Sequence, residues 1–271
     1  MRRLRQQSNL RNSRQNNLFL DTYTGASFAV SIRKLKNAYI GPCMRVRRDS
    51  DDTEKDIYFK FVEGTGYIVD IDAIIGFCFT ASAFVVKWYD QSGNNNHLVQ
   101  TTASSQAKIL NAGTAYTNNS LPAIYFDSSF YEIQNTVALL APYCFLQVSK
   151  KESPVFSAIT DSTSSYAFVA FSDNRNYTAT TANTKFFVNT ASNLVLAINW
   201  IDDSNLIVLY NGLNPTITNV VSARTNTVNI YGMWTGLLNT GYAQESILFS
   251  EDKQTDQSAM NTNLNDFYNV Y

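Results

Sequence analysis

The feature that most constrains the fold is a series of about a dozen short apolar segments, separated by turn-forming residues roughly every 8 to 15 positions. Residues 84–89 are typical, because Phe, Val, Trp and Tyr make up most of a short run with the composition of a buried strand. The run stops at residues 90–96, where Asp, Ser, Gly and Asn favour turns. This pattern predicts an all-β sandwich or jelly roll of antiparallel sheets.

One helix is predicted clearly, at the C-terminal end of the sequence. Met260, Leu264, Phe267 and Tyr268 recur at helical spacing and would share one face, with Thr255 and Asp256 as a candidate N-cap. Residues 70–77 could form one or two further helical turns. The helix at the end of the chain is expected to pack against a sheet face.

The first 22 residues differ in composition from the rest. They carry no acid before Asp21 and cannot bury enough apolar surface to fold alone. We therefore predict an extended docking arm at 1–22 and a single β-sandwich at 23–271. A basic arm that binds nucleic acid is the alternative, although five arginines would give only modest affinity. The residues expected to dock are Arg2, Arg3, Arg5, Arg11 and Arg14.

The charge balance gives little support for a nucleic-acid partner. The chain has 21 basic and 22 acidic residues, a net charge of −1, and 16% charged residues against a usual value of about 25%. Asn, Thr and Ser replace the missing charges. A polar but weakly charged surface is typical of an extracellular or virion β-protein.

The cysteines and the hydropathy pattern indicate neither a metal site nor a membrane protein. Cys43, Cys78 and Cys144 are widely spaced and lie beside apolar residues, so we expect buried free thiols. The acidic segment at 49–56 lacks the spacing of an EF-hand loop, and a solvated turn beside arginines is expected there. We predict no cofactor, no metal, no signal peptide and no membrane-spanning segment.

Several segments together resemble a known family. The sequence from Ser31 through the Gly41-Pro42 turn to Asp56, and the run Trp88-Tyr-Asp-Gln-Ser-Gly-Asn-Asn-Asn-His-Leu, resemble the catalytic domain of alpha-L-arabinofuranosidase B. The resemblance implies a concanavalin A-like jelly-roll sandwich. Domains with this pairing, followed by a Pro-Ala-Ile-Tyr-Phe-Asp strand and an Asp-Gln-Ser-Ala helix, also resemble those of bacteriophage structural proteins.

The resemblance also implies a retaining glycosidase, which needs a Glu nucleophile and an Asp acid/base about 5 Å apart. No Glu occurs from Ser153 through Gln244, and the turn at 232–237 has no carboxylate. The family's adjacent cysteine pair is missing as well. We therefore predict that the chain is not an enzyme, with a relocated pair such as Asp161 and Asp173 as the alternative. His97 is the one histidine and is expected to be a turn or packing residue.

Three functions follow from these observations. The preferred one is a non-catalytic bacteriophage virion structural protein: a head or tail fibre, decoration or receptor-binding component, anchored by its arm and able to bind host glycans. The alternatives are an active arabinofuranosidase-type glycoside hydrolase and a free carbohydrate-binding module. The candidate ligand-binding residues are Trp88, Tyr89, Asp90, Trp234 and Tyr242.

The preferred function sets the expected partners. Other virion proteins, from capsid or tail, would bind through residues 1–22, and the chain would form a homo-oligomer, a trimer by analogy with fibres. A host surface glycan is a further expected ligand. The expected location is the virion, assembled in the host cytoplasm.

Overall fold

The computed structural model describes residues 17–127, 129–139, 142–152, 155–160, 166–171, 175–180, 183–188, 193–200, 206–213, 218–219, 228–234 and 240–271. Within these ranges, 19 strands join into one continuous antiparallel network. They are β1 (Ala26–Ser31), β2 (Met44–Arg48), β3 (Glu54–Ile57), β6 (Ala83–Trp88), β7 (Leu98–Val99), β8 (Lys108–Asn111), β9 (Thr114–Ala115), β12 (Ile124–Asp127), β13 (Phe130–Leu139), β14 (Tyr143–Lys151), β15 (Val155–Thr160), β16 (Tyr166–Phe171), β17 (Arg175–Thr180), β18 (Asn183–Val188), β19 (Asn193–Trp200), β20 (Leu206–Tyr210), β21 (Thr218–Asn219), β22 (Val228–Trp234) and β23 (Thr240–Phe249).

Two small hairpins and a few helices complete the described part of the chain. The hairpins pair β4 (Phe59–Val62) with β5 (Gly66–Val69) and β10 (Thr117–Asn118) with β11 (Leu121–Pro122). The helices are α2 (Phe19–Thr22), α3 (Ile71–Cys78), α4 (Gln257–Tyr268) and a 3-10 turn at Ala103–Ser105.

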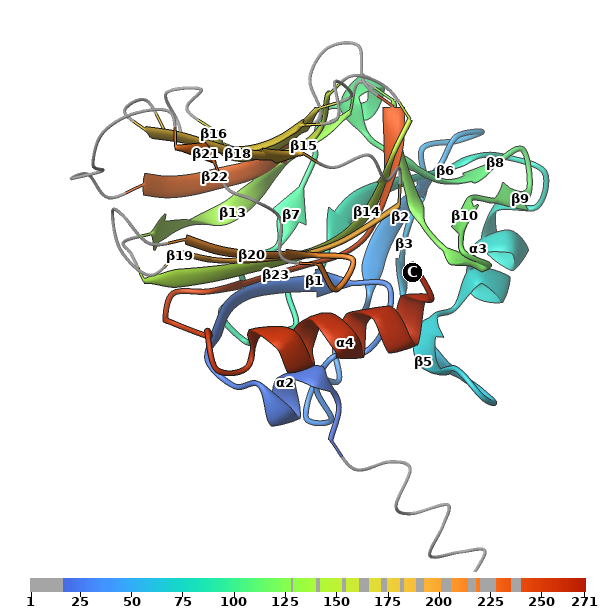
Figure 1. Ribbon diagram of the computed structural model, residues 1–271. Helices are drawn as coiled ribbons and strands as arrows, with labels where there is room; N and C mark the ends of the chain where they lie inside the picture. The colour runs from blue at the N-terminus through green and yellow to red at the C-terminus, as the bar shows by residue number, and fades with distance from the viewer. Residues whose placement is uncertain are drawn as a thin grey trace, which may run out of the picture.

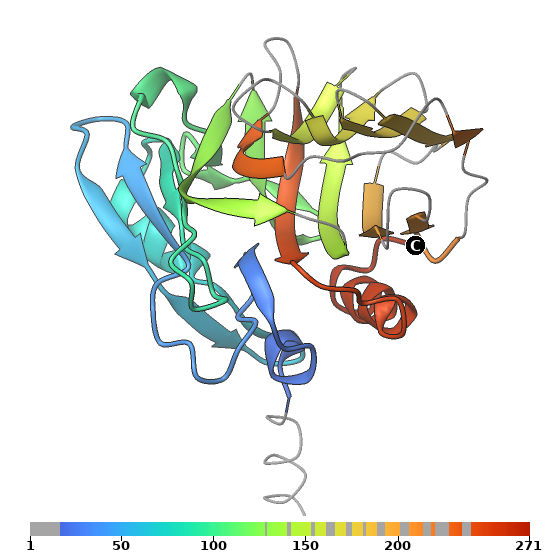
Figure 2. The same ribbon diagram turned by 90° about the vertical axis from the view of Figure 1, so that its left-hand side faces the viewer.

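The strand network folds over itself into two layers, which confirms the predicted concanavalin A-like sandwich with a C-terminal helix. Figure 1 shows β1, β14, β19, β20 and β23 in one layer, with α4 against its outer face, and β13, β15, β16, β18 and β22 in the other. Seen from the side, the layers lie above α2 and α4 (Figure 2). The two predicted sheets are joined through shared strands such as β6 and β7, rather than being separate.

Strand β23 organises one layer because it has partners on both edges. It pairs with β14 along one edge and with β1 and then β12 along the other. The register opposite β14 shifts between Val148 and Ser149, and the extra residue on β23 is Gln244. Such a bulge changes which side chains face each side of a strand.

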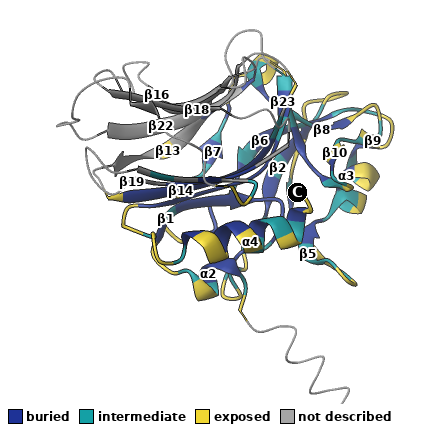
Figure 3. Cartoon of the chain, in the orientation of Figure 1, coloured by how far each residue is buried: buried dark blue, intermediate teal, exposed yellow. Residues whose placement is uncertain are grey.

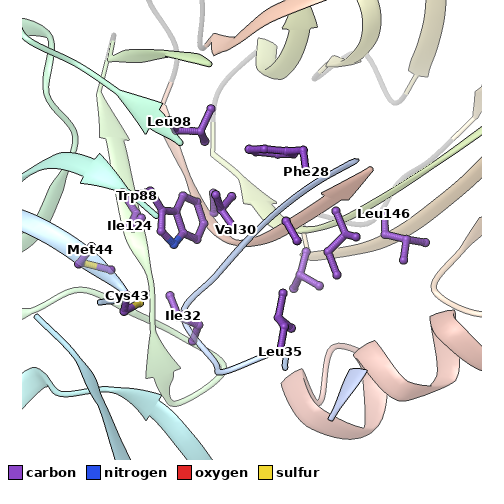
Figure 4. Close-up of a cluster of buried hydrophobic side chains, with 14 of the residues drawn as sticks. Phe28, Val30, Ile32, Leu35, Cys43, Met44, Trp88, Leu98, Ile124 and Leu146 are labelled. Atoms are coloured by element: carbon purple, nitrogen blue, oxygen red, sulfur yellow. The ribbon is translucent and has the colours of Figure 1, made fainter. Parts of the chain in front are cut away.

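The core lies between the layers and reaches under α4. Alternation buries one face of strands such as β12, as the sequence pattern predicts, whereas β1 and β23 are buried on both faces over most of their length (Figure 3). Figure 4 shows the Trp88 ring beside Val30 and Ile124 in this core. All three cysteines are buried free thiols, as predicted, and burial raises the pKa of each.

The N-terminal segment differs from the prediction at its end. Residues 19–22, assigned to an extended arm, form helix α2, because Phe19 and Leu20 are buried against the sandwich. Residues 1–16, including the arginines expected to dock, lie outside the described residues. The docking role of that segment stays a prediction.

A buried ion pair joins β1, β23 and α4. The Arg33 guanidinium donates to both Glu245 oxygens, with Nε–Oε2 at 2.8 Å and Nη2–Oε1 at 3.0 Å. The hydroxyls of Ser31 and Tyr268 donate to Glu245 Oε2 at 2.6 and 2.8 Å. Burial alone would lower the pKa of Arg33, but the adjacent Glu245 carboxylate and its hydrogen bonds raise it, so Arg33 stays charged.

We expect Glu245→Gln to lower the free energy of unfolding by about 3 to 5 kcal/mol, because it leaves the buried Arg33 charge uncompensated. Urea unfolding followed by tryptophan fluorescence measures this loss. The matched control is Asp72→Asn, which breaks the exposed ion pair with Lys60 and should leave the midpoint unchanged. An equal loss of unfolding free energy in the two variants would show that the buried ion pair stabilises the protein no more than the exposed one.

Candidate functional site

The loop after β6 is organised by the Asp90 carboxylate. Its Oδ1 accepts hydrogen bonds from the backbone N–H of Ala29 at 2.8 Å and of Ser92 at 2.9 Å. Its Oδ2 accepts from the Ser92 hydroxyl at 2.7 Å and from the Asn96 N–H at 2.9 Å. Asp90 is 2% exposed. All of these bonds are local or reach β1, so the carboxylate closes a turn and holds it against that strand.

The amide side chains of the same loop bind the backbone around β1. Gln91 accepts from Leu35 N–H at 2.7 Å and donates to the Arg33 carbonyl at 3.0 Å. Asn94 and Asn96 donate to carbonyl groups at the start of β1. Gly93 adopts a φ of +101°, which explains the glycine in this tight turn. Residues 90–97, which we call the clamp loop, therefore hold β1 in place.

A hollow of about 420 Å³ lies between this loop and the start of β1. Leu20, Ala26, Lys36 and Asn94 are among its lining residues. The Asn94 amide already donates to two β1 carbonyls, those of Ala26 and Ser27. Because the Asn94 amide is occupied in this way, we assign the hollow no ligand.

His97 completes the loop. Its Nδ1 accepts the Asp90 N–H at 3.0 Å, and its ring meets Tyr89 edge to face, with centroids 5.0 Å apart. Partial burial lowers the pKa of His97, the nearby Lys87 ammonium lowers it further, and Asp90 opposes both. The neutral imidazole is therefore the form that the fold requires, in the packing role predicted from the sequence.

The first two predicted ligand-binding aromatic residues lie in different environments. Trp88 is 1% exposed, so its ring is part of the core and does not reach the surface. Tyr89 is half-buried, and its hydroxyl donates to Asp56 Oδ1 at 2.9 Å. Asp56 also accepts two hydrogen bonds from Arg45, each 2.8 Å long. Burial, together with the Asp56 carboxylate, raises the pKa of Tyr89 to about 12.

Tyr242 lies in a group of three tyrosines on the outer face of the layer. The Tyr116 and Tyr125 rings stack with centroids 4.6 Å apart and planes at 15°. Tyr242 pairs directly with Tyr125 across β12 and β23, with ring centroids 5.2 Å apart. The ring centroids of Tyr116 and Tyr242 are 6.2 Å apart. We call Tyr116, Tyr125 and Tyr242, together with the polar residues described next, the tyrosine face.

Two exposed carboxylates flank the start of β23 on this face. Asp127 pairs with Thr240 on one side, and the Glu152 N–H donates to the Thr240 carbonyl at 3.0 Å on the other. Lys150 contacts Glu152 at 3.2 Å, and its ammonium lies 5.1 Å from the Tyr242 ring centroid. The tyrosine face thus combines aromatic rings, hydroxyls and carboxylates on one surface.

Sequence reasoning found Tyr242 but missed the rest of the tyrosine face. The usable signal was the alternation in the strand that ends at Asp127, which places Tyr125 and Asp127 on the side opposite to the apolar Ile124 and Phe126. The pairing of that strand with β23 is long-range and could not be read from the sequence. The Trp234 backbone ends β22, while its side chain lies outside what the structure describes.

Other kinds of site find no support in the part of the chain that the structure describes. No cluster of three or more His, Cys, Asp or Glu residues there could hold a metal ion. No helix in the same ranges has the length and apolar character needed to cross a bilayer. Asp161 and Asp173, the predicted alternative pair, lie outside the described residues.

Comparison with known families gives one match. The model described as alpha-L-arabinofuranosidase B, catalytic, matches residues 20–128. That range contains residues 31–56 and 88–98, which are the segments that carry the resemblance in the sequence. No curated protein matches the chain.

The fold of the whole chain is similar to that of solved arabinofuranosidases. A GH54 α-L-arabinofuranosidase soaked with a cyclic sulfate inhibitor has 16% identity and a TM-score of 0.63, over 93% of this chain and 65% of that chain. An arabinofuranosidase complexed with arabinofuranosyl-α-1,2-xylobiose has 15% identity and the same TM-score, over 93% and 64%. This chain thus spans about two thirds of their length.

These findings correct the functional prediction. The preferred function, a non-catalytic bacteriophage virion component, is contradicted, because the matched family model is that of a catalytic domain and no finding points to a phage. The prediction that the chain is not an enzyme is contradicted on the same ground. It rested on the lack of Glu from Ser153 through Gln244, on the lack of a carboxylate in the turn at 232–237 and on the missing cysteine pair. An aspartate elsewhere in the chain supplies the same carboxylate chemistry.

We expect Asp90→Ala to destabilise the protein by about 3 kcal/mol, because three N–H groups lose their common acceptor in a buried turn. Thermal unfolding measured by circular dichroism tests this, with the exposed Asp266→Ala on α4 as the control. A melting temperature for Asp90→Ala within 1 °C or so of the control would contradict the clamp.

The stability of the protein should also depend on His97 protonation. Its folded-state pKa lies below that of the unfolded chain, so the unfolded chain binds a proton first as the pH falls. The contribution is fully present above a pH of about 6.5 and is lost as the pH falls through the folded-state pKa. Urea midpoints measured between pH 7.5 and 5 should fall more in the wild type than in His97→Gln. Parallel curves would exclude this role.

Proposed function

We propose that the protein is a glycoside hydrolase of the α-L-arabinofuranosidase type. The observation that carries the proposal is the family match over residues 20–128, which includes the clamp loop and the strand it secures. The similarity of fold over 93% of the chain supports the same class. The substrate class is a glycan or glycoside with a terminal α-L-arabinofuranosyl group.

The described part of the chain supplies a frame for such an enzyme. The acidic side chains Asp56 and Asp90 are both occupied, the first by Arg45 and Tyr89 and the second by backbone donors. Glu245 is fully buried and bound to Arg33. These three carboxylates serve structure, so they are unsuited to bind a substrate.

Hydrolysis of a glycosidic bond needs two carboxyl groups, one to protonate the leaving oxygen and one to act as nucleophile or base. The segment 153–244 contains no Glu, so a carboxylate from that part of the chain has to be an aspartate. Its aspartates are Asp161, Asp173, Asp202 and Asp203. We propose that the catalytic pair comes from these four residues.

The direct test is release of 4-nitrophenol from 4-nitrophenyl α-L-arabinofuranoside, the compound soaked into a related GH54 variant. We expect turnover by the wild type, and a loss of at least about a hundredfold in kcat when either member of the pair becomes Asn. Each of the four aspartates is replaced singly, and circular dichroism confirms that every variant folds.

The outcomes separate the parts of this proposal. Failure of the wild type to cleave this glycoside or an arabinofuranosyl-substituted xylo-oligosaccharide would overturn the activity. Cleavage that survives all four replacements would keep the activity and overturn the assignment to aspartates of 153–244.

A further inference from the structure

We propose that the tyrosine face is a binding surface for neutral polysaccharide. It would hold the chain of a pentose-rich glycan whose side group is cleaved. The choice of glycan rests on the proposed function, but the binding surface itself rests on the geometry of Tyr116, Tyr125 and Tyr242.

The register of the strands places this surface on the outside of the sandwich. Tyr125 alternates with Ile124 and Phe126, which are fully buried, so its ring points away from the core. On β14, Lys150 lies opposite Tyr242, and Val148 lies opposite Glu245. Lys150 and Val148 are two residues apart, so their side chains are on the same face of β14. Because of the bulge at Gln244, Tyr242 and Glu245 therefore share one face of β23.

Helix α4 covers Glu245 but not Tyr242 on this face of β23. Glu245 is covered by Tyr268 of α4, whose hydroxyl donates to it. Tyr242 lies three residues nearer the start of β23, where it is only partly buried. The tyrosine face thus begins where the cover provided by α4 ends, and a ligand could reach it.

The composition of the face matches a sugar better than other ligands. Sugars present apolar C–H surfaces, which pack on aromatic rings, and hydroxyl groups, which bind carboxylates and other hydroxyls. The three rings supply the first kind of contact. Asp127, Glu152 and the tyrosine hydroxyls supply the second.

The charges of the face argue for a neutral ligand. Two exposed carboxylates, Asp127 and Glu152, lie beside the rings, and the nearby Lys150 ammonium already contacts Glu152. A phosphate or a uronic acid would be repelled by this arrangement. Burial raises the pKa of each tyrosine, Glu152 raises all three further, and Asp127 adds to the rise for Tyr116 and Tyr125, so the hydroxyls remain donors at neutral pH.

The experiment compares binding to a polymer with cleavage of a small substrate. Dissociation constants are measured by affinity gel electrophoresis at 4 °C with soluble arabinoxylan in the gel. We expect Tyr116→Ala and Tyr242→Ala each to weaken binding about three- to tenfold, with a larger loss in the double variant. The rate with 4-nitrophenyl α-L-arabinofuranoside should stay within twofold of the wild type.

Two controls sharpen the result. Tyr58→Ala removes a tyrosine that is 54% exposed elsewhere on the surface and should leave polymer binding unchanged. Polygalacturonate, an acidic polymer, should not retard the wild type. Unchanged arabinoxylan binding in the double variant, or no binding by the wild type, would overturn the proposal. Absence of hydrolysis would count against the proposed function alone, because binding is measured independently.

Discussion

The structure depends on one buried ion pair, in which the Arg33 guanidinium meets the Glu245 carboxylate between β1, β23 and α4. Neither charge would be tolerated alone at this depth, because desolvation of an unpaired ion costs several kcal/mol. The hydroxyls of Ser31 and Tyr268 donate hydrogen bonds to the carboxylate. The Phe267 ring packs on the guanidinium, with its centroid 4.7 Å from Arg33 Cζ. The pair thereby links residues that are more than 200 positions apart in the sequence.

The same strand carries the structural pair and part of the proposed binding surface. The bulge in β23 turns both Glu245 and Tyr242 outward, the first under α4 and the second beyond it. Strand β1 and the residues just after it are held by the loop at 90–97, because the N–H groups of Ala29 and Leu35 donate to the side chains of Asp90 and Gln91. A frame secured in this way commits Glu245 and Asp90 to structural contacts and leaves the tyrosine face for the proposed polymer binding.

Much of the fold could be predicted from the sequence, because it is encoded locally. The alternation and turn residues around 84–96 predicted a strand and a tight loop, and the spacing of Met260 and Leu264 predicted α4. The tyrosine face could not be predicted in full, because Tyr116, Tyr125 and Tyr242 meet only through long-range pairing. The functional prediction failed because carboxylates and cysteines missing from the expected positions were taken to mean that the chain has no catalytic pair elsewhere.

Hydrogen exchange followed by mass spectrometry in increasing urea tests most directly whether the buried pair joins these elements into one unit. Peptides covering β1, β23 and α4 should then lose protection together, at a single urea concentration, because opening any one of them exposes the Arg33 or Glu245 charge. Loss of protection in α4 at markedly lower urea than in β1 would contradict the account.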